Sequence, residues 1–233
     1  MRTLVFDISG PYGHFRKPYA PVSPVTYPFP PPPTVLGMIG AILGLGKDEY
    51  HQKLGWDQVR IGIRLLKPAQ IYRTAINLVS TKKKETWCRT DTRLQIPHEF
   101  LKNPAYRIYV AALPDSLMDR LAKLLKADKT VYTPCLGLAQ CLAETRFTAD
   151  TSAILQPTAK TTRAVIPMTE QVKIEYESGH RYERVRVAAR MRPGRIVTEY
   201  KEAVTALDAD VRKTVRVQGC ELYRINDEHI AFF

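Results

Sequence analysis

A run of prolines that leads into a glycine-containing apolar segment restricts the fold of this chain more than any other feature. Prolines stand at positions 28 and 30–33, and residues 35–46 read VLGMIGAILGLG. Because proline fixes φ and has no N–H, the run predicts an extended lead-in that cannot lie in a central strand. The apolar spacing that follows predicts a helix, with Thr34 as its N-cap.

Small residues form one side of this expected helix, at Gly37, Gly40, Ala41 and Gly44. Each interior glycine costs about 1 kcal/mol relative to alanine, so we expect another group to approach closely. One interpretation is a β-sheet packed under the helix. The other is a phosphate at the helix N-terminus, where unpaired N–H groups favour anions. The predicted order of strands and helices favours packing of this helix on a sheet. Thr34 and Val35 then remain as a secondary candidate for a phosphate site.

The charge balance indicates a polyanionic partner. The 233 residues hold 35 Lys and Arg against 23 Asp and Glu, a net charge of +12, so nucleic acid is the first expectation. The longest apolar run is shorter than the roughly 20 residues of a membrane span, and the N-terminus lacks a signal-peptide pattern. We therefore expect a cytoplasmic protein without membrane contact.

Metal and cofactor chemistry have no motif in this sequence. The four cysteines, at 88, 135, 141 and 220, form no C-x-x-C pair and have no histidine at zinc spacing. They are expected to be free thiols, and no metal site or cofactor is predicted.

The order of periodic segments predicts an α+β fold with two regions. Strand patterns occupy residues 3–9, 59–66, 106–113 and about 141–148, and helical patterns follow the first and the third. A strand–helix–strand–strand–helix–strand order is the ferredoxin-like arrangement, in which two helices cover one face of a four-stranded sheet. We expect this domain to span residues 1–147. Residues 148–233 are expected to form a β-rich C-terminal region.

A long insertion separates the second and third strands, at about residues 68–103. Two β-type runs flank a basic stretch there, which predicts a long β-hairpin with a basic tip. Between residues 71 and 107 there are eight Lys or Arg against three Asp or Glu. A solvated edge that prevents aggregation is the alternative for the lysines, and packing against its own strands is the alternative for Trp87.

Two further basic segments are candidates for nucleic-acid binding. The loop at 14–26 mixes charged and aromatic residues, which suit phosphates and bases. In the strand pattern YERVRVAAR, alternation places Arg184 and Arg186 on one face. Arg190 and Arg192 follow in the same basic stretch. An ordinary surface loop and a solvated strand face are the alternatives.

Enzyme signatures for nucleotide phosphates, zinc proteases or serine nucleophiles are absent from the sequence. Metal-free RNA cleavage needs only a general base, a general acid and a cation, which Tyr, His and Lys supply. The candidates for that chemistry are Tyr50, His51 and His98.

Four stretches together resemble the CRISPR-associated family five protein. They are FDISGPYGHFRKPY, TYPFPPPPTVLGMIGAILG, IPHEFLKNPAYRIYVA and YTPCLGLAQCLAE, within residues 1–145. The resemblance implies a subunit of the type I Cascade complex, closest to the I-B-like subtypes, that binds the 5′ handle of the CRISPR RNA (crRNA) without cleaving it. It implies an RNA-recognition-type ferredoxin-like domain of the repeat-associated superfamily, with the insertion as its thumb.

The resemblance also implies partners and contact residues. The partners would be the crRNA, the backbone subunit, the large subunit and, in the assembled complex, target DNA of an antiviral defence. RNA contacts carried over from the family lie in the thumb and in the loop after the first strand: Arg73, Lys82, Lys83, Lys84, Trp87, Arg89 and Arg93, and His14, Arg16, Lys17 and Tyr19. In the I-C subtype the related subunit is a metal-independent endoribonuclease that uses Tyr, Lys and His. Pro97 and His98 stand here in place of its adjacent Lys-His pair.

Overall fold

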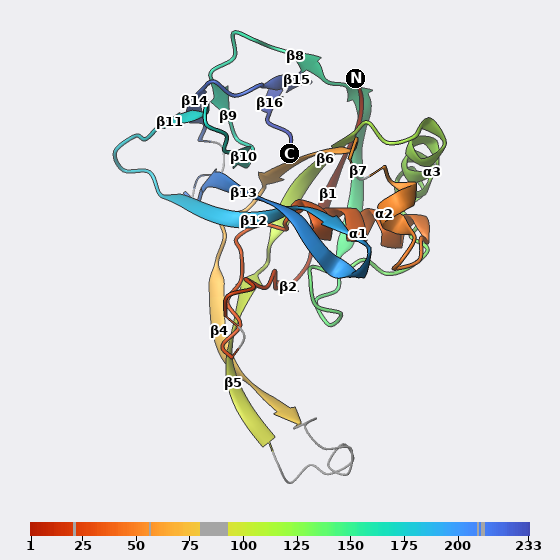
Figure 1. Ribbon diagram of the computed structural model, residues 1–233, viewed down its shortest axis with the longest axis vertical. Helices are drawn as coiled ribbons and strands as arrows, with labels where there is room; N and C mark the ends of the chain where they lie inside the picture. Colours follow the sequence, from red (N-terminus) through yellow and green to blue (C-terminus); the bar gives the residue numbers. More distant parts are fainter. Residues whose placement is uncertain (21, 56, 80–92, 209, 211–212) are drawn as a thin grey trace.

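The computed structural model describes residues 1–20, 22–55, 57–79, 93–208, 210 and 213–233. It combines helices with several antiparallel sheets, so the predicted mixed α+β class is confirmed (Figure 1). No helix in these described ranges is both long and apolar enough to cross a membrane.

A central antiparallel sheet has the strand order β3-β6-β1-β7. Helices α1 and α2 lie between β1 and β3 in the chain, and α3 lies between β6 and β7, so the predicted element order is present. The bounds are β1 Arg2–Ser9, α1 Pro32–Leu43, α2 Tyr50–Lys53, β3 Arg60–Leu65, β6 Ala105–Ala111, α3 Asp115–Lys126 and β7 Glu144–Ser152.

Helix α1 lies between two layers of sheet. Its side chains Leu36 and Ile39 join a buried cluster that contains Phe6 of the central sheet. The same cluster contains Val185 and Val187, which come from β12 (Tyr182–Arg192) in the C-terminal region. Because both sides of α1 are covered, the helix lies in a hydrophobic core that the two halves of the chain share.

The N-terminus of α1 differs from the prediction. The N-cap is Pro31, and Pro32 and Pro33 occupy the first two helical positions, so the assignment of Thr34 as N-cap was wrong. The prolines have no N–H to offer. The N–H groups of Thr34 and Val35 both donate to the carbonyl oxygen of Pro31, at 2.9 and 3.1 Å. The predicted phosphate site at this terminus therefore lacks free donors.

The small side of α1 does not meet the central sheet, so that expectation was wrong too. A Cβ on Gly40 would lie 3.1 Å from Cβ of Tyr50, and one on Gly37 would lie 4.0 Å from its hydroxyl oxygen. Gly44 has a φ of +73°, and its Cβ would lie 2.6 Å from Cγ1 of Val131. The glycines accommodate α2 and the segment that follows α3.

A long hairpin projects from the body, as predicted for residues 68–103 (Figure 1). Strands β4 (Ile71–Val79) and β5 (Arg93–Lys102) pair in register from Ile71↔Leu101 to Val79↔Arg93. The two-residue strand β2 (Tyr12–Gly13) extends this sheet beside β5. We call β4 and β5 the arm. The predicted tip residues Lys82, Lys83, Lys84, Trp87 and Arg89 lie outside the described residues.

The C-terminal region is β-rich and covers the second face of the central sheet. Glu228 accepts hydrogen bonds from Arg64, Arg107 and Tyr109 of that sheet. The strands are β8 Ile154–Leu155, β9 Thr161–Thr162, β10 Ile166–Pro167, β11 Lys173–Glu175, β13 Ile196–Ala206, β14 Val215–Gln218, β15 Tyr223–Ile225 and β16 Glu228–Ile230. Sheet β10-β13-β12 packs on α1, and β15 and β16 hold Glu228 over the central sheet.

Gly37, inside α1, and Gly44, the C-cap just after it, should respond oppositely to alanine. Gly37→Ala should raise the free energy of unfolding by about 1 kcal/mol, because alanine favours the helix and its Cβ meets only ordinary contact. Gly44→Ala should lower it by about 1 kcal/mol or more, because of its positive φ and the nearby Val131. Urea denaturation of both variants checks this. Equal shifts would contradict the packing described here.

Candidate nucleic-acid interface

Three basic segments that are distant in the sequence meet at the root of the arm. Nζ of Lys17 lies 3.2 Å from the Glu183 carboxylate at the start of β12. The Tyr27 hydroxyl donates to the carbonyl oxygen of Arg186 at 2.6 Å. On the other side, the N–H of Glu99 in β5 donates to the carbonyl oxygen of Pro24 at 3.1 Å. The loop at 14–27 therefore joins the arm to β12 in one continuous surface.

The four predicted loop residues are not equally accessible. Arg16 and Tyr19 are exposed, whereas Lys17 is half-buried by Glu183 and lies 5.5 Å from the centre of the Tyr27 ring. The His14 side chain is only 2% exposed. Its Nδ1 donates to the carbonyl oxygen of Glu99 at 2.7 Å. Of the four, Arg16 and Tyr19 are the side chains that lie open to solvent.

On the described part of the arm, Arg73 and Arg93 are exposed. The Arg73 guanidinium lies 3.0 Å from the Glu99 carboxylate, so part of its charge is balanced within the chain.

The predicted alternation in β12 is present, because Arg184 and Arg186 are exposed while Val185 and Val187 are buried. Glu202 forms an ion pair with Arg184. The Arg186 guanidinium lies 4.9 Å from the centre of the Tyr200 ring, and it forms no ion pair with a carboxylate among the described residues.

The two remaining arginines also differ. The Arg190 guanidinium lies 3.0 Å from the Glu199 carboxylate and 3.5 Å from that of Asp57. Arg192 is exposed and forms no ion pair with any residue in the described ranges. Arg186 and Arg192 thus carry the more available charge of this row.

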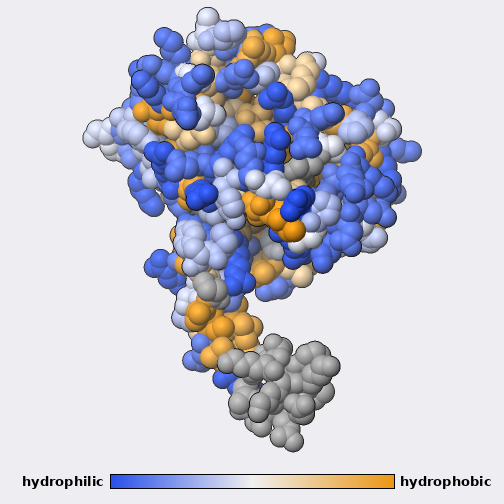
Figure 2. All heavy atoms as spheres, in the orientation of Figure 1, coloured by the Kyte–Doolittle hydropathy of each residue, from blue (hydrophilic) through white to orange (hydrophobic). Residues whose placement is uncertain are grey.

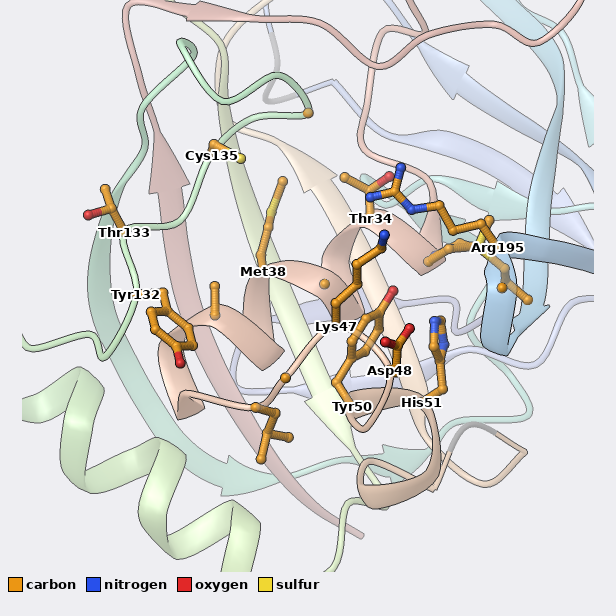
Figure 3. Close-up of a pocket in the computed structure, with 18 residues that line it drawn as sticks. Thr34, Met38, Lys47, Asp48, Tyr50, His51, Tyr132, Thr133, Cys135 and Arg195 are labelled. Carbon is orange, nitrogen blue, oxygen red and sulfur yellow. The ribbon is translucent and has the colours of Figure 1, made fainter.

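A hollow of about 710 Å³ lies between α1, α2 and the turn Pro193–Arg195 that links β12 to β13 (Figure 3). Lys47, Tyr50 and His51 line it from one side, and Arg195 lines it from the other. The Tyr50 and His51 ring centres are 3.9 Å apart. Burial raises the pKa of Tyr50, against the opposing charge of Arg195, and burial lowers the pKa of His51.

The structure separates the residues considered for RNA cleavage. Tyr50 and His51 share this hollow, whereas the His98 ring lies in the arm, 5.5 Å from that of His14. Sequence analysis missed Lys47 and Arg195. The sequence could have indicated Lys47, because it lies three positions before Tyr50. Arg195 could not be found in this way, because only the position of the β12–β13 turn brings it to the hollow.

Two tyrosines at the root of the arm were also missed. The rings of Tyr12 and Tyr72 are 6.0 Å apart, centre to centre. Tyr72 lies in a β-type run of the sequence, and Tyr12 lies in the turn expected after the first strand. Their proximity depends on the pairing of β2 with β5. Among the described residues, no three His, Cys, Asp or Glu side chains gather in a way that could hold a metal ion.

Acidification should destabilise the protein through His14. Burial, reinforced by the nearby charges of His98 and Arg16, lowers the pKa of His14 below its ordinary 6.5. The unfolded chain then binds a proton more readily than the folded one. The free energy of unfolding is therefore unaffected above about pH 6.5 and falls as the pH drops below that value.

Urea denaturation at about pH 7.5 and about pH 5.5 measures this loss. His14→Gln, whose amide retains a donor for the Glu99 carbonyl, should reduce the loss. His51, whose pKa burial also lowers, should supply part of the remainder. An identical loss in the variant would show that His14 does not contribute.

Comparisons with known proteins agree with this fold. The family model described as CRISPR-associated protein (Cas_Cas5) matches residues 3–212. The structure is similar to a CRISPR protein from Archaeoglobus fulgidus, with a TM-score of 0.61 and 14% identity over 99% of this chain and 98% of that one. A chain of a CRISPR RNA-guided surveillance complex is similar with a TM-score of 0.51 and 12% identity, over 98% of this chain and 91% of that one. No curated protein sequence gives a significant match.

The two structural likenesses concern the fold, and the family model concerns the sequence itself. Because that model covers nearly the whole sequence, the chain belongs to the CRISPR-associated Cas5 protein family.

Proposed function

We propose that this protein is a non-catalytic subunit of a type I CRISPR surveillance complex, in which it binds and caps the 5′ handle of the crRNA. In this role it contacts the backbone subunit and the large subunit, and it supports RNA-guided recognition of target DNA. Family membership and the net charge of +12 support the proposal. The similarity of its fold to a chain of an RNA-guided surveillance complex is consistent with it.

The observation that carries the proposal is the surface formed by the loop at 14–27, the root of the arm and β12. The contacts of Lys17 with Glu183 and of Tyr27 with Arg186 hold the loop against β12. Arg16 and Arg186 are exposed at this junction, and Arg192 is exposed at the far end of β12. An exposed basic surface of this kind suits the backbone of single-stranded RNA.

The physical role would be positioning. Phosphate contacts and base stacking hold one RNA end in register, and base pairing by the guide reads the target sequence. The tip lysines Lys82, Lys83 and Lys84 belong to the proposal as further phosphate contacts, together with Trp87, Arg89 and Arg93.

The salt dependence of RNA binding tests the phosphate contacts. Each lost contact lowers the slope of log affinity against log salt by about 0.7 for a single strand. Replacing Arg186 and Arg192 together by Ala should lower it by up to about 1.4, and replacing Lys82, Lys83 and Lys84 by up to about 2.

Arg120→Ala is the matched control for this measurement, because Arg120 is exposed on α3, outside the proposed surface. An unchanged slope in the β12 variant would remove Arg186 and Arg192 from the RNA contact. An unchanged slope in the tip variant would remove the tip.

The hollow lined by Lys47, Tyr50 and His51 favours a second candidate function, metal-independent cleavage of precursor CRISPR RNA. These residue types supply a cation, a proton donor and a base.

Incubation of the protein with a transcript that contains one CRISPR repeat, in EDTA, decides between the two functions. We expect no cleavage. Cleavage at a single position that is abolished by Tyr50→Phe or His51→Ala, and retained in His98→Ala, would place an active site in the hollow and overturn the non-catalytic assignment.

A further inference from the structure

Two half-exposed tyrosine rings stand together at the root of the arm. Tyr12 is 42% exposed and Tyr72 is 45% exposed. The angle between the ring planes is 43°, at the centre-to-centre distance of 6.0 Å. Large aromatic surface left open to water in this way requires an explanation, because burying it would be favourable.

Strand register places both rings on one face of the β2-β5-β4 sheet. Tyr12 pairs with Lys102, and Tyr72 pairs with Phe100. Paired residues in antiparallel strands share a face, and so do residues two apart on one strand, such as Phe100 and Lys102. The two tyrosines therefore flank Phe100 and Lys102.

A packed floor supports the two rings. Phe100 is only 8% exposed, and its ring meets Tyr12 edge-on at 6.2 Å and 76°. The His98 ring stacks beside Phe100 at 5.8 Å. Because Phe100 is held in place beneath them, Tyr12 and Tyr72 do not depend on a ligand for their position. Such preorganisation lowers the entropic cost of binding a flat ligand.

The chemistry of this face changes along the arm. Lys102 is exposed beside the rings and forms no ion pair with any residue that the structure describes. Farther along the same face, Ile76 pairs with Ile96 and Leu78 pairs with Leu94. Leu78 and Leu94 are exposed. Figure 2 shows this hydrophobic stretch on the far half of the described arm. On the described part of this face, rings combined with a cation occur at the root only.

We propose that Tyr12 and Tyr72 form a stacking platform for one or two unpaired bases of single-stranded RNA, with Lys102 on an adjacent phosphate. Aromatic rings bind unpaired bases by stacking, without sequence preference, and a neighbouring cation binds the backbone. This inference rests on the proposed RNA-binding function and assigns residues to it that the sequence did not suggest.

Binding of the full-length protein to two single-stranded probes tests the platform. One probe is a fluorescent oligoadenylate, and the other is an abasic ribose-phosphate chain of equal length and charge. Tyr12→Ala and Tyr72→Ala should each weaken oligoadenylate binding roughly tenfold, within a range of about 5- to 150-fold, and leave abasic binding unchanged.

Two kinds of control variant isolate the aromatic ring. Tyr12→Phe and Tyr72→Phe retain it, and should bind oligoadenylate like the unmodified protein. Leu94→Ala removes an exposed apolar side chain from the same face of the arm, and should also have no effect.

The binding results distinguish a wrong platform from a wrong RNA-binding function. If the unmodified protein binds oligoadenylate and the alanine variants bind equally well, the platform is overturned and RNA binding stands. If the alanine variants retain RNA affinity but no longer join the other subunits, the face docks protein and the platform is again overturned. If the unmodified protein binds neither probe, both proposals fall.

A second measurement on the unmodified protein covers the case in which an alanine variant does not fold. Stacking quenches the fluorescence of 2-aminopurine, so we expect quenching when this base replaces adenine in the bound oligoadenylate. Quenching that persists in the phenylalanine variants supports the platform. An absence of quenching at every position overturns it.

Discussion

The packing of α1 between the central sheet and β12 is the constraint on which the rest of the structure depends. The proline lead-in runs through the core, where the Tyr106 hydroxyl donates to the carbonyl oxygen of Pro28 at 2.9 Å. This contact fixes the C-terminal end of the loop at 14–27, which leads into the prolines. Tyr27, bonded to the Arg186 carbonyl, links the same segment to β12. The surface that joins loop, arm and β12 therefore exists because α1 is buried on both sides.

The C-terminal strands cover the face of the central sheet that the helices leave open. Glu228 forms ion pairs with Arg64 and Arg107 on the sheet, and the chain there lies so close that a Cβ on Gly62 would be 2.6 Å from Cγ2 of Ile230. With α1 and α3 on the opposite face, neither face of this sheet is open there to a nucleic acid. The side chains that we propose for RNA binding therefore lie beside this sheet, on the loop at 14–27, on the arm and on β12.

Fewer positive side chains are available to a ligand than the net charge alone indicates. Arg184 and Arg190 have carboxylate partners within the chain, and so does Lys17. Arg186 lies against the Tyr200 ring and has no ion-pair partner in the part of the chain that the structure describes. Strand alternation predicts that Arg184 and Arg186 share a face. The register of β12 with β13 places Glu202 opposite Arg186, but its carboxylate reaches diagonally to Arg184.

Periodicity alone determined the element order, the arm and the β-rich second half, because alternation and helical spacing are local properties of the sequence. It did not determine the neighbours of the glycines in α1 and at its C-cap, which meet Tyr50 and Val131. Nor did it determine the helix start, where Pro31 supplies the acceptor expected from Thr34. The pairing of β2 with β5, which brings Tyr12 beside Tyr72, joins residues far apart in the chain. Tertiary structure decided these features because each depends on long-range contacts, which local residue patterns do not encode.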